Sequence, residues 1–149
     1  LYNPVKDESY YFQKGLGGFR NDSRIRVSEK KKINDSIISF YCKKNSLSDN
    51  LELENIRQII RENNIETRES GSIGNDICIL TSGKIECLLF SDSDLYVKDQ
   101  INLLLSETGG VLNKVIFKKK EIYLASNKYI GKIIKEMIEN KNEAYWKTT

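Results

Sequence analysis

The chain has 149 residues, of which 39% are hydrophobic and 30% are charged, and this composition suffices for one domain with a hydrophobic core. Its net charge of +3 comes from 24 basic and 21 acidic residues, a balance typical of a solvated mixed-charge surface, so a nucleic-acid partner is conceivable but unsupported. The absence of histidine excludes Ser-His and Cys-His catalytic pairs within the chain and argues against zinc. No apolar run is long enough to span a bilayer, and we expect no membrane partner.

The cysteines point to a reducing, cytoplasmic environment. Cys42, Cys78 and Cys87 are odd in number and lack paired spacing, and the apolar context of Cys42 and Cys78 is typical of core positions. The start of the chain carries a different signal, because Leu1 is not an initiator methionine and Asn3-Pro4 is typical of the inside of a domain. A fragment of a longer chain is therefore one interpretation.

The first 34 residues predict the end of an antiparallel sheet. Tyr10 and Phe12 alternate with Tyr11 and Gln13, and a glycine-rich turn over 15–18 leads into a second strand at 19–20. A phosphate loop would need a helix after these glycines, whereas a turn follows at 21–23, so we favour the turn. Residues 25–27 predict a further short strand. The basic run 30–32 could contact phosphate but is more typical of a solvated loop.

From Ser36 onward, strands alternate with helices, which predicts an α/β domain over 35–140 beside the antiparallel sheet. Ser72 is the expected N-cap and Gly83 the expected stop of its second helix. The predicted elements are a central strand at 36–42, a polar connector at 45–50, a helix at 51–63 capped by Asp49 or Asn50, a helix at 72–82, a strand at 85–90, a helix from about Asp94 to Gly109-Gly110, strands at 115–117 and 121–125 around a basic turn, and a helix from Ser126 or Asn127. The tail 141–149 is expected to be polar and either frayed or an interaction segment.

The sequence contains an ordered series of short motifs. They are Leu1-Tyr2-Asn3-Pro4, Asp7-Glu8, the turn from Gly15 to Phe19, Ile25-Arg26-Val27-Ser28, Arg68 with Gly71-Ser72, Gly83, and Glu107-Thr108-Gly109-Gly110. In their order and spacing they resemble the C-terminal half of the inositol monophosphatase family. The resemblance implies an αβαβα sandwich, of which this chain would form the C-terminal α/β layer and the last hairpin of the N-terminal antiparallel sheet. It also implies magnesium-dependent hydrolysis of inositol or sugar phosphate monoesters, and usually a homodimer.

The resemblance carries over only part of the family's site. Gly71, Ser72 and Ile73 match the substrate-binding loop, whose backbone at a helix start could face an anion or polyol. The family's metal-binding aspartate, which follows an aromatic residue and precedes the double glycine by twelve, falls on Val97. Its substrate-contacting glutamate falls on Phe90, and neither replacement can serve as a ligand or hydrogen-bond acceptor.

Other carboxylates do not fill this gap. The family's remaining metal ligands, a glutamate and the segment D-P-x-D-G-T, lie upstream of the position corresponding to Leu1. Asp92, Asp94 and Asp99 lie near Val97 in the sequence. The spacing from Gly71 to Gly110 matches the family's without an insertion or deletion, so no shift brings one of these aspartates to the ligand position. We therefore interpret them as surface or helix-start carboxylates. No metal ligand and no catalytic residue is therefore assigned in this chain.

Two functional classes stay open. The chain is either part of a magnesium-dependent phosphatase that another segment or subunit completes, without activity by itself, or a non-catalytic interaction protein that keeps the fold and dimer surface. Association of some bacterial relatives with the transcription machinery makes an RNA or protein partner conceivable for the second class. In both classes the N-terminal hairpin exposes a sheet edge, through which partner pairing or aggregation is expected.

Overall fold

The N-terminal residues form a four-stranded antiparallel sheet. Its strands are β1 (Tyr2–Asn3), β2 (Glu8–Gln13), β3 (Gly17–Arg20) and β4 (Ser23–Ile25), in the order β1-β2-β3-β4. The predicted alternation is confirmed, because Tyr10 is buried while Tyr11 is exposed and stacks on Phe19. The predicted strand at 25–27 extends too far, because β4 ends at Ile25. The amide of Val27 donates to the carbonyl of Thr108 instead of to a neighbouring strand.

A five-stranded mixed sheet forms the centre of the molecule. Its strands are β5 (Ile37–Tyr41), β6 (Glu66–Glu69), β7 (Cys87–Ser91), β8 (Val111–Phe117) and β9 (Lys120–Ser126), in the order β6-β5-β7-β9-β8. β5 pairs in parallel with β6 and β7, whereas β9 pairs antiparallel with β7 and β8. The predicted central strand is thereby confirmed. β6 was not predicted, because its sequence Glu-Thr-Arg-Glu has no apolar residue to reveal a strand.

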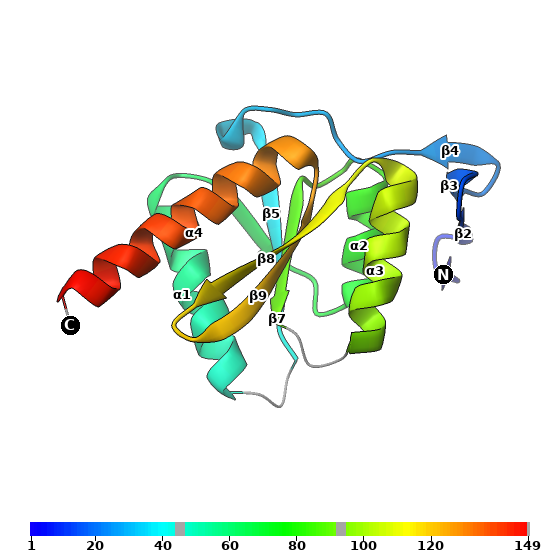
Figure 1. The fold of residues 1–149 in the computed structure, drawn as a ribbon. Helices are drawn as coiled ribbons and strands as arrows, with labels where there is room; N and C mark the ends of the chain where they lie inside the picture. The colour runs from blue at the N-terminus through cyan, green and yellow to red at the C-terminus, as the bar shows by residue number, and fades with distance from the viewer. Residues whose placement is uncertain (44–46, 92–94, 149) are drawn as a thin grey trace.

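Helices cover both faces of this sheet, as the computed structural model shows in Figure 1. α1 (Leu47–Glu62) and α4 (Lys128–Thr148) cover one face, and α2 (Ile73–Thr81) and α3 (Leu95–Thr108) lie between the other face and the small sheet. The structure describes residues 1–43, 47–91 and 95–148. No helix within these ranges is long and apolar enough to cross a membrane.

Two apolar clusters fill the spaces on either side of the sheet. On the α1/α4 face, Phe40 and Leu124 of the sheet pack with Leu53 and Ile134 of the helices. On the α2/α3 face, the cluster includes Ile77, Leu80, Leu88, Ile101 and Leu105. Burial of this much apolar area is the main source of the stability of the layers.

Two helix boundaries differ from the predictions. α1 begins at Leu47, so the predicted connector is wrong over 47–50, and the predicted cap positions 49 and 50 lie within the helix. α4 runs to Thr148, so the segment predicted as a tail is helical over 141–148, and its role as an interaction segment stays a prediction. Asn142 helps to hold this end, since its Oδ1 accepts a hydrogen bond of 3.1 Å from the amide of Lys118.

The segment between the two sheets is fixed by buried polar side chains. Glu86 is fully buried; its Oε2 accepts from the amide of Ile37 at 2.7 Å, and its Oε1 lies 3.3 Å from Lys30 Nζ. Asn127 Nδ2 donates to the carbonyls of Ser28 and Lys30 at 3.0 Å each. These contacts hold the chain segment that leaves the small sheet in place against the central sheet.

Candidate functional site

The loop between β6 and α2 carries the three residues that the sequence places in a substrate site. Gly71 has a φ of +74°, a left-handed conformation that glycine adopts without cost. Ser72 is the N-cap of α2, as predicted: its Oγ accepts a 3.2 Å hydrogen bond from the amide of Asn75. The amide of Ser72 donates to Ser70 Oγ at 3.1 Å, so this N–H is already used within the loop. An external ligand would meet the amides of Ile73 and Gly74, which the first turn of a helix leaves free.

A fully buried carboxylate lies beneath this loop. Asp76 has an exposed fraction of 0%, and neither of its carboxylate oxygens has a hydrogen-bond partner among the described residues. Arg68 Nη2 is 3.9 Å from its Oδ1. Burial raises the pKa of Asp76, and the neighbouring Ser70, Ser39 and Arg68 oppose this shift only in part. The sequence contained the signal, because Asp76 lies three residues after Ile73 and one before Ile77 on the apolar face of α2.

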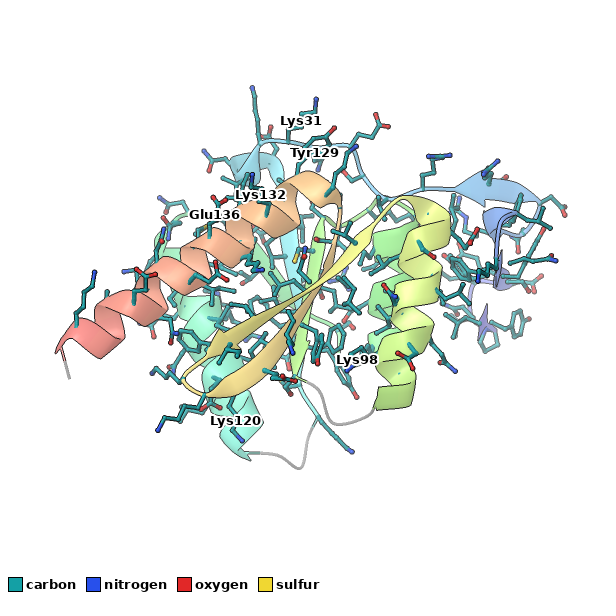
Figure 2. All side chains as sticks on the ribbon, in the orientation of Figure 1. Lys31, Lys98, Lys120, Tyr129, Lys132 and Glu136 are labelled. Atoms are coloured by element: carbon teal, nitrogen blue, oxygen red, sulfur yellow. The ribbon has the colours of Figure 1, made fainter. Side chains whose placement is uncertain are left out.

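Apolar packing occupies the two positions where the resemblance expects carboxylates. Phe90, at the end of β7, is only 3% exposed and stacks on Tyr123 with ring centroids 5.6 Å apart. Val97, in the first turn of α3, is half-buried and packs against the same cluster. Tyr123 also receives a 3.2 Å hydrogen bond from Lys98 Nζ, which lies 4.9 Å from its ring centroid; Figure 2 labels Lys98 on the face of α3 toward the sheet.

Among the described residues, the side chains present here do not fit a magnesium site. Magnesium is bound through carboxylate oxygens and water, and phosphoryl transfer uses two such ions in a cluster. Within residues 1–43, 47–91 and 95–148, no three His, Cys, Asp or Glu side chains come together in a group that could hold a metal ion. Asp99 is exposed on α3, while Asp92 and Asp94 lie outside the described residues, as does the side chain of Tyr96. The valine and the phenylalanine offer no oxygen ligand.

The glycine-rich turn already holds an anionic group of the protein itself. Glu107, in the last turn of α3, accepts hydrogen bonds from the amides of Gly15 at 2.9 Å and Gly17 at 3.0 Å through its two carboxylate oxygens. Both glycines have positive φ values, +81° and +102°, which turn their amides toward this carboxylate. The turn therefore joins the small sheet to α3, which explains why glycines are needed there without a bound phosphate.

The basic run at 30–32 is exposed, as a solvated loop should be. Lys30 pairs with the buried Glu86. Lys31 Nζ lies 4.9 Å from the ring centroid of Tyr129 at the start of α4, and Figure 2 labels both residues at this end of the molecule. These contacts give the lysines roles within the protein.

The sequence matches a known protein family. The model of the inositol monophosphatase family matches residues 1–146. A curated relative, the inositol-1-monophosphatase of Rhizobium meliloti, is 27% identical over 146 residues, which are 93% of this chain and 54% of the relative.

The fold is likewise shared with solved structures. The extragenic suppressor protein suhB from Bartonella henselae matches with a TM-score of 0.77 and 23% identity over 92% of this chain and 54% of that protein. The inositol monophosphatase from Anabaena matches with a TM-score of 0.76 and 19% identity over 93% and 57%. The expected αβαβα-type fold is thus confirmed, and the chain spans about half the length of the relatives it matches. The chain belongs to the inositol monophosphatase family.

Proposed function

We propose that this chain is a partial or degenerate member of a phosphatase family that has no hydrolytic activity by itself. The observation that carries the proposal is the pair Phe90 and Val97, whose side chains are packed into the apolar cluster of the α2/α3 face. Hydrolysis of a phosphate monoester such as an inositol or sugar phosphate needs carboxylates to hold magnesium. In this proposal those carboxylates come from residues outside the 149.

The loop at Gly71, Ser72 and Ile73 is the part of the substrate site that this chain would contribute. Its support is the free first turn of α2, which favours an anionic or polyol ligand through the helix dipole and the amides of Ile73 and Gly74. We also propose a division into a sheet region at 1–34, an α/β domain at 35–140 and a terminal segment at 141–149, the last being helical to Thr148.

A reducing, cytoplasmic setting and a homodimer complete the proposal. All three cysteines are free thiols. Burial raises the pKa of Cys78 to about 11 and also raises that of Cys87, so both side chains are held as neutral thiols in the core, as in proteins of reducing compartments.

A second candidate function is a non-catalytic interaction protein that keeps the fold and its association surfaces. The observation that favours it is the number of exposed large apolar side chains on the small sheet and its loops, among them Leu1, Tyr2, Val5, Tyr11 and Leu16. Exposed apolar patches of this kind mark interaction surfaces. An RNA partner has no comparable support here.

Phosphate release tests the proposal that the chain has no hydrolytic activity by itself. The purified chain is incubated with inositol monophosphate and magnesium, and free phosphate is measured against a reaction without metal, with the Rhizobium meliloti relative as a positive control for the assay. We expect release at the background rate, because Val97 and Phe90 provide no ligand. Magnesium-dependent turnover well above background would contradict the proposal. The variant Val97→Asp in the same chain should stay inactive, since one carboxylate does not make the site.

A further inference from the structure

The hydroxyl of Ser70 closes the loop between β6 and α2. Ser70 Oγ donates a hydrogen bond of 3.1 Å to the carbonyl of Ser72 and accepts one of 3.1 Å from the amide of the same residue. Gly71 lies between them with a φ of +74°, which lets the chain turn back on itself. The Ser72 carbonyl also accepts the first hydrogen bond of α2, from the amide of Asp76 at 3.0 Å. One hydroxyl therefore ties the loop to the start of the helix.

The carboxyl of Asp76 lies beneath this hydroxyl. It is fully buried, and both Ser70 and Ser39 are close enough to lower its pKa. Ser39 lies in β5 and is fully buried, and its Oγ has no hydrogen-bond partner among the described residues. Ser39 pairs in register with Arg68 of β6, and residues paired in this way point to the same face of a sheet. The carboxyl thus faces two hydroxyls and one guanidinium.

The charged side chains that act on this carboxyl come from the end of β6. Arg68 Nη2 is 3.9 Å from Asp76 Oδ1 and favours the ionised form, whereas Glu69 favours the neutral form. The side chain of Arg68 is 39% exposed, so water screens its charge. Burial is the largest influence and raises the pKa of Asp76. The carboxyl is therefore neutral at low pH and ionises as the pH rises through its folded pKa.

We propose that Asp76 is a positioning residue for the loop between β6 and α2 and acts through the hydroxyl of Ser70. A hydroxyl has one proton to donate. While the carboxyl is neutral, this proton stays in the bond to the Ser72 carbonyl. The ionised carboxylate is the stronger acceptor, because charge-assisted hydrogen bonds are about twice as strong as neutral ones, so the hydroxyl turns to it and releases the Ser72 carbonyl. The inference rests on the proposed function, in which this loop belongs to a substrate site.

An ion pair with Arg68 alone is the simplest alternative. It would keep the carboxyl ionised at every pH at which the protein is folded, while the Ser70 hydroxyl stayed bonded within the loop. The separation of 3.9 Å is at the limit of an ion pair, and neither carboxylate oxygen makes a hydrogen bond of good geometry among the described residues. The ionisation state of Asp76 separates this alternative from the proposal, and NMR measures it directly.

Carbon-13 NMR of the complete chain between about pH 4 and pH 9 is the test. The carboxyl carbon of Asp76 reports its ionisation, and the carbonyl carbon of Ser72 reports the hydrogen bond from Ser70. In the parent protein we expect both resonances to shift with the same midpoint, above the ordinary pKa of 3.8. In Asp76→Asn the Ser72 resonance should lose its pH dependence and stay near its low-pH position.

Ser70→Ala distinguishes a positioning role from simple packing. The Asp76 carboxyl should still titrate, with a higher midpoint because the carboxylate has lost a donor, and the Ser72 carbonyl should no longer follow it. Ser106→Ala is the matched control, because its hydroxyl donates to a backbone carbonyl of α3 at 2.8 Å, and it should leave both titrations unchanged. Glu69→Gln should lower the Asp76 midpoint without breaking the coupling.

Four results would overturn the proposal. They are an Asp76 carboxyl that keeps one ionisation state over the whole pH range, a Ser72 carbonyl whose midpoint differs from that of Asp76, coupling that survives Ser70→Ala, and an Asp76 midpoint that Ser70→Ala does not raise. Phosphate release by the chain alone would contradict the proposed absence of activity but would not alter these titrations. The two failures are therefore distinguishable.

Discussion

Asp76 shows at the scale of one residue how the site region departs from ordinary packing. A buried carboxylate normally has hydrogen-bond partners, because transfer of an unpaired charge from water is costly. Here neither oxygen makes a hydrogen bond of good geometry among the described residues, although Ser70 and Ser39 are close enough to lower the pKa of the carboxyl, and the guanidinium of Arg68 is at the limit of an ion pair. The protonated form of the carboxyl is therefore stabilised in the folded protein.

The stability of the protein should depend on pH through Asp76. Burial raises its folded pKa above the ordinary value of 3.8, so the folded protein binds this proton more tightly than the unfolded chain does. The free energy of unfolding should then fall as pH rises from about 4 through the folded pKa. In Asp76→Asn this decrease should be smaller, and at neutral pH the variant should be more stable by about 1 kcal/mol.

Urea unfolding at several pH values measures the effect. Asp99→Asn is the matched control, because Asp99 is exposed on α3, and it should keep the pH dependence of the parent protein. Identical slopes for Asp76→Asn and the parent protein would show that the buried carboxyl does not control this dependence.

At the scale of elements, the hairpin of β8 and β9 combines an uncommon sequence with a demanding turn. Phe117 pairs with Lys120, which leaves Lys118 and Lys119 as the loop, and both have positive φ values, +47° and +68°. Two-residue hairpin loops with this geometry favour Asn-Gly because side chains with a Cβ are strained there. The loop is therefore a point where a substitution should stabilise the fold.

Lys119→Gly should raise the free energy of unfolding by about 0.5–1 kcal/mol, since glycine adopts the left-handed conformation without strain. Lys120→Gly is the matched control. Lys120 begins β9, where glycine should instead lower stability by a similar amount because it loses more conformational freedom on folding. Thermal or urea unfolding of both variants measures the difference, and a loss of stability in Lys119→Gly would contradict this account of the turn.

The elements with strong periodicity could be predicted from the sequence, and those fixed by distant contacts could not. Ile73, Ile77 and Leu80 revealed α2, and the apolar run of β5 revealed a central strand. β6 has no apolar pattern and forms only because it pairs with β5. For the candidate site, the sequence predicts a substrate loop at Gly71 and the loss of two family carboxylates at Val97 and Phe90, and both stay predictions. It could not reveal that Glu107 fills the glycine turn, because these residues meet only in the folded chain.

At the scale of the whole molecule, the two sheets differ in how firmly they are held. The central sheet is covered on both faces by extensive apolar clusters. The small sheet packs on α2 through a cluster whose buried members among the described residues are Tyr10, Ile25 and Cys78, with Phe12 partly buried. Each buried apolar side chain contributes about 1.5–3 kcal/mol. The small sheet should therefore open without the rest of the molecule, and the Glu107 contact to Gly15 and Gly17 should resist this opening.

Native-state hydrogen exchange should then show two levels of protection. Amides in β2 and β3 should exchange through an opening that is lower in free energy, by about 2 kcal/mol or more, than the opening that exposes β5 and β7. Glu107→Gln replaces one of the two carboxylate oxygens that accept from the glycine turn, so it should lower the protection of β2 and β3 by about 1 kcal/mol and leave β5 unchanged. Glu136→Gln, on the exposed side of α4 (Figure 2), should change neither level. A single level of protection across both sheets would mean that the small cluster and the Glu107 contact couple the sheets into one cooperative unit, and the expected separate opening would be wrong.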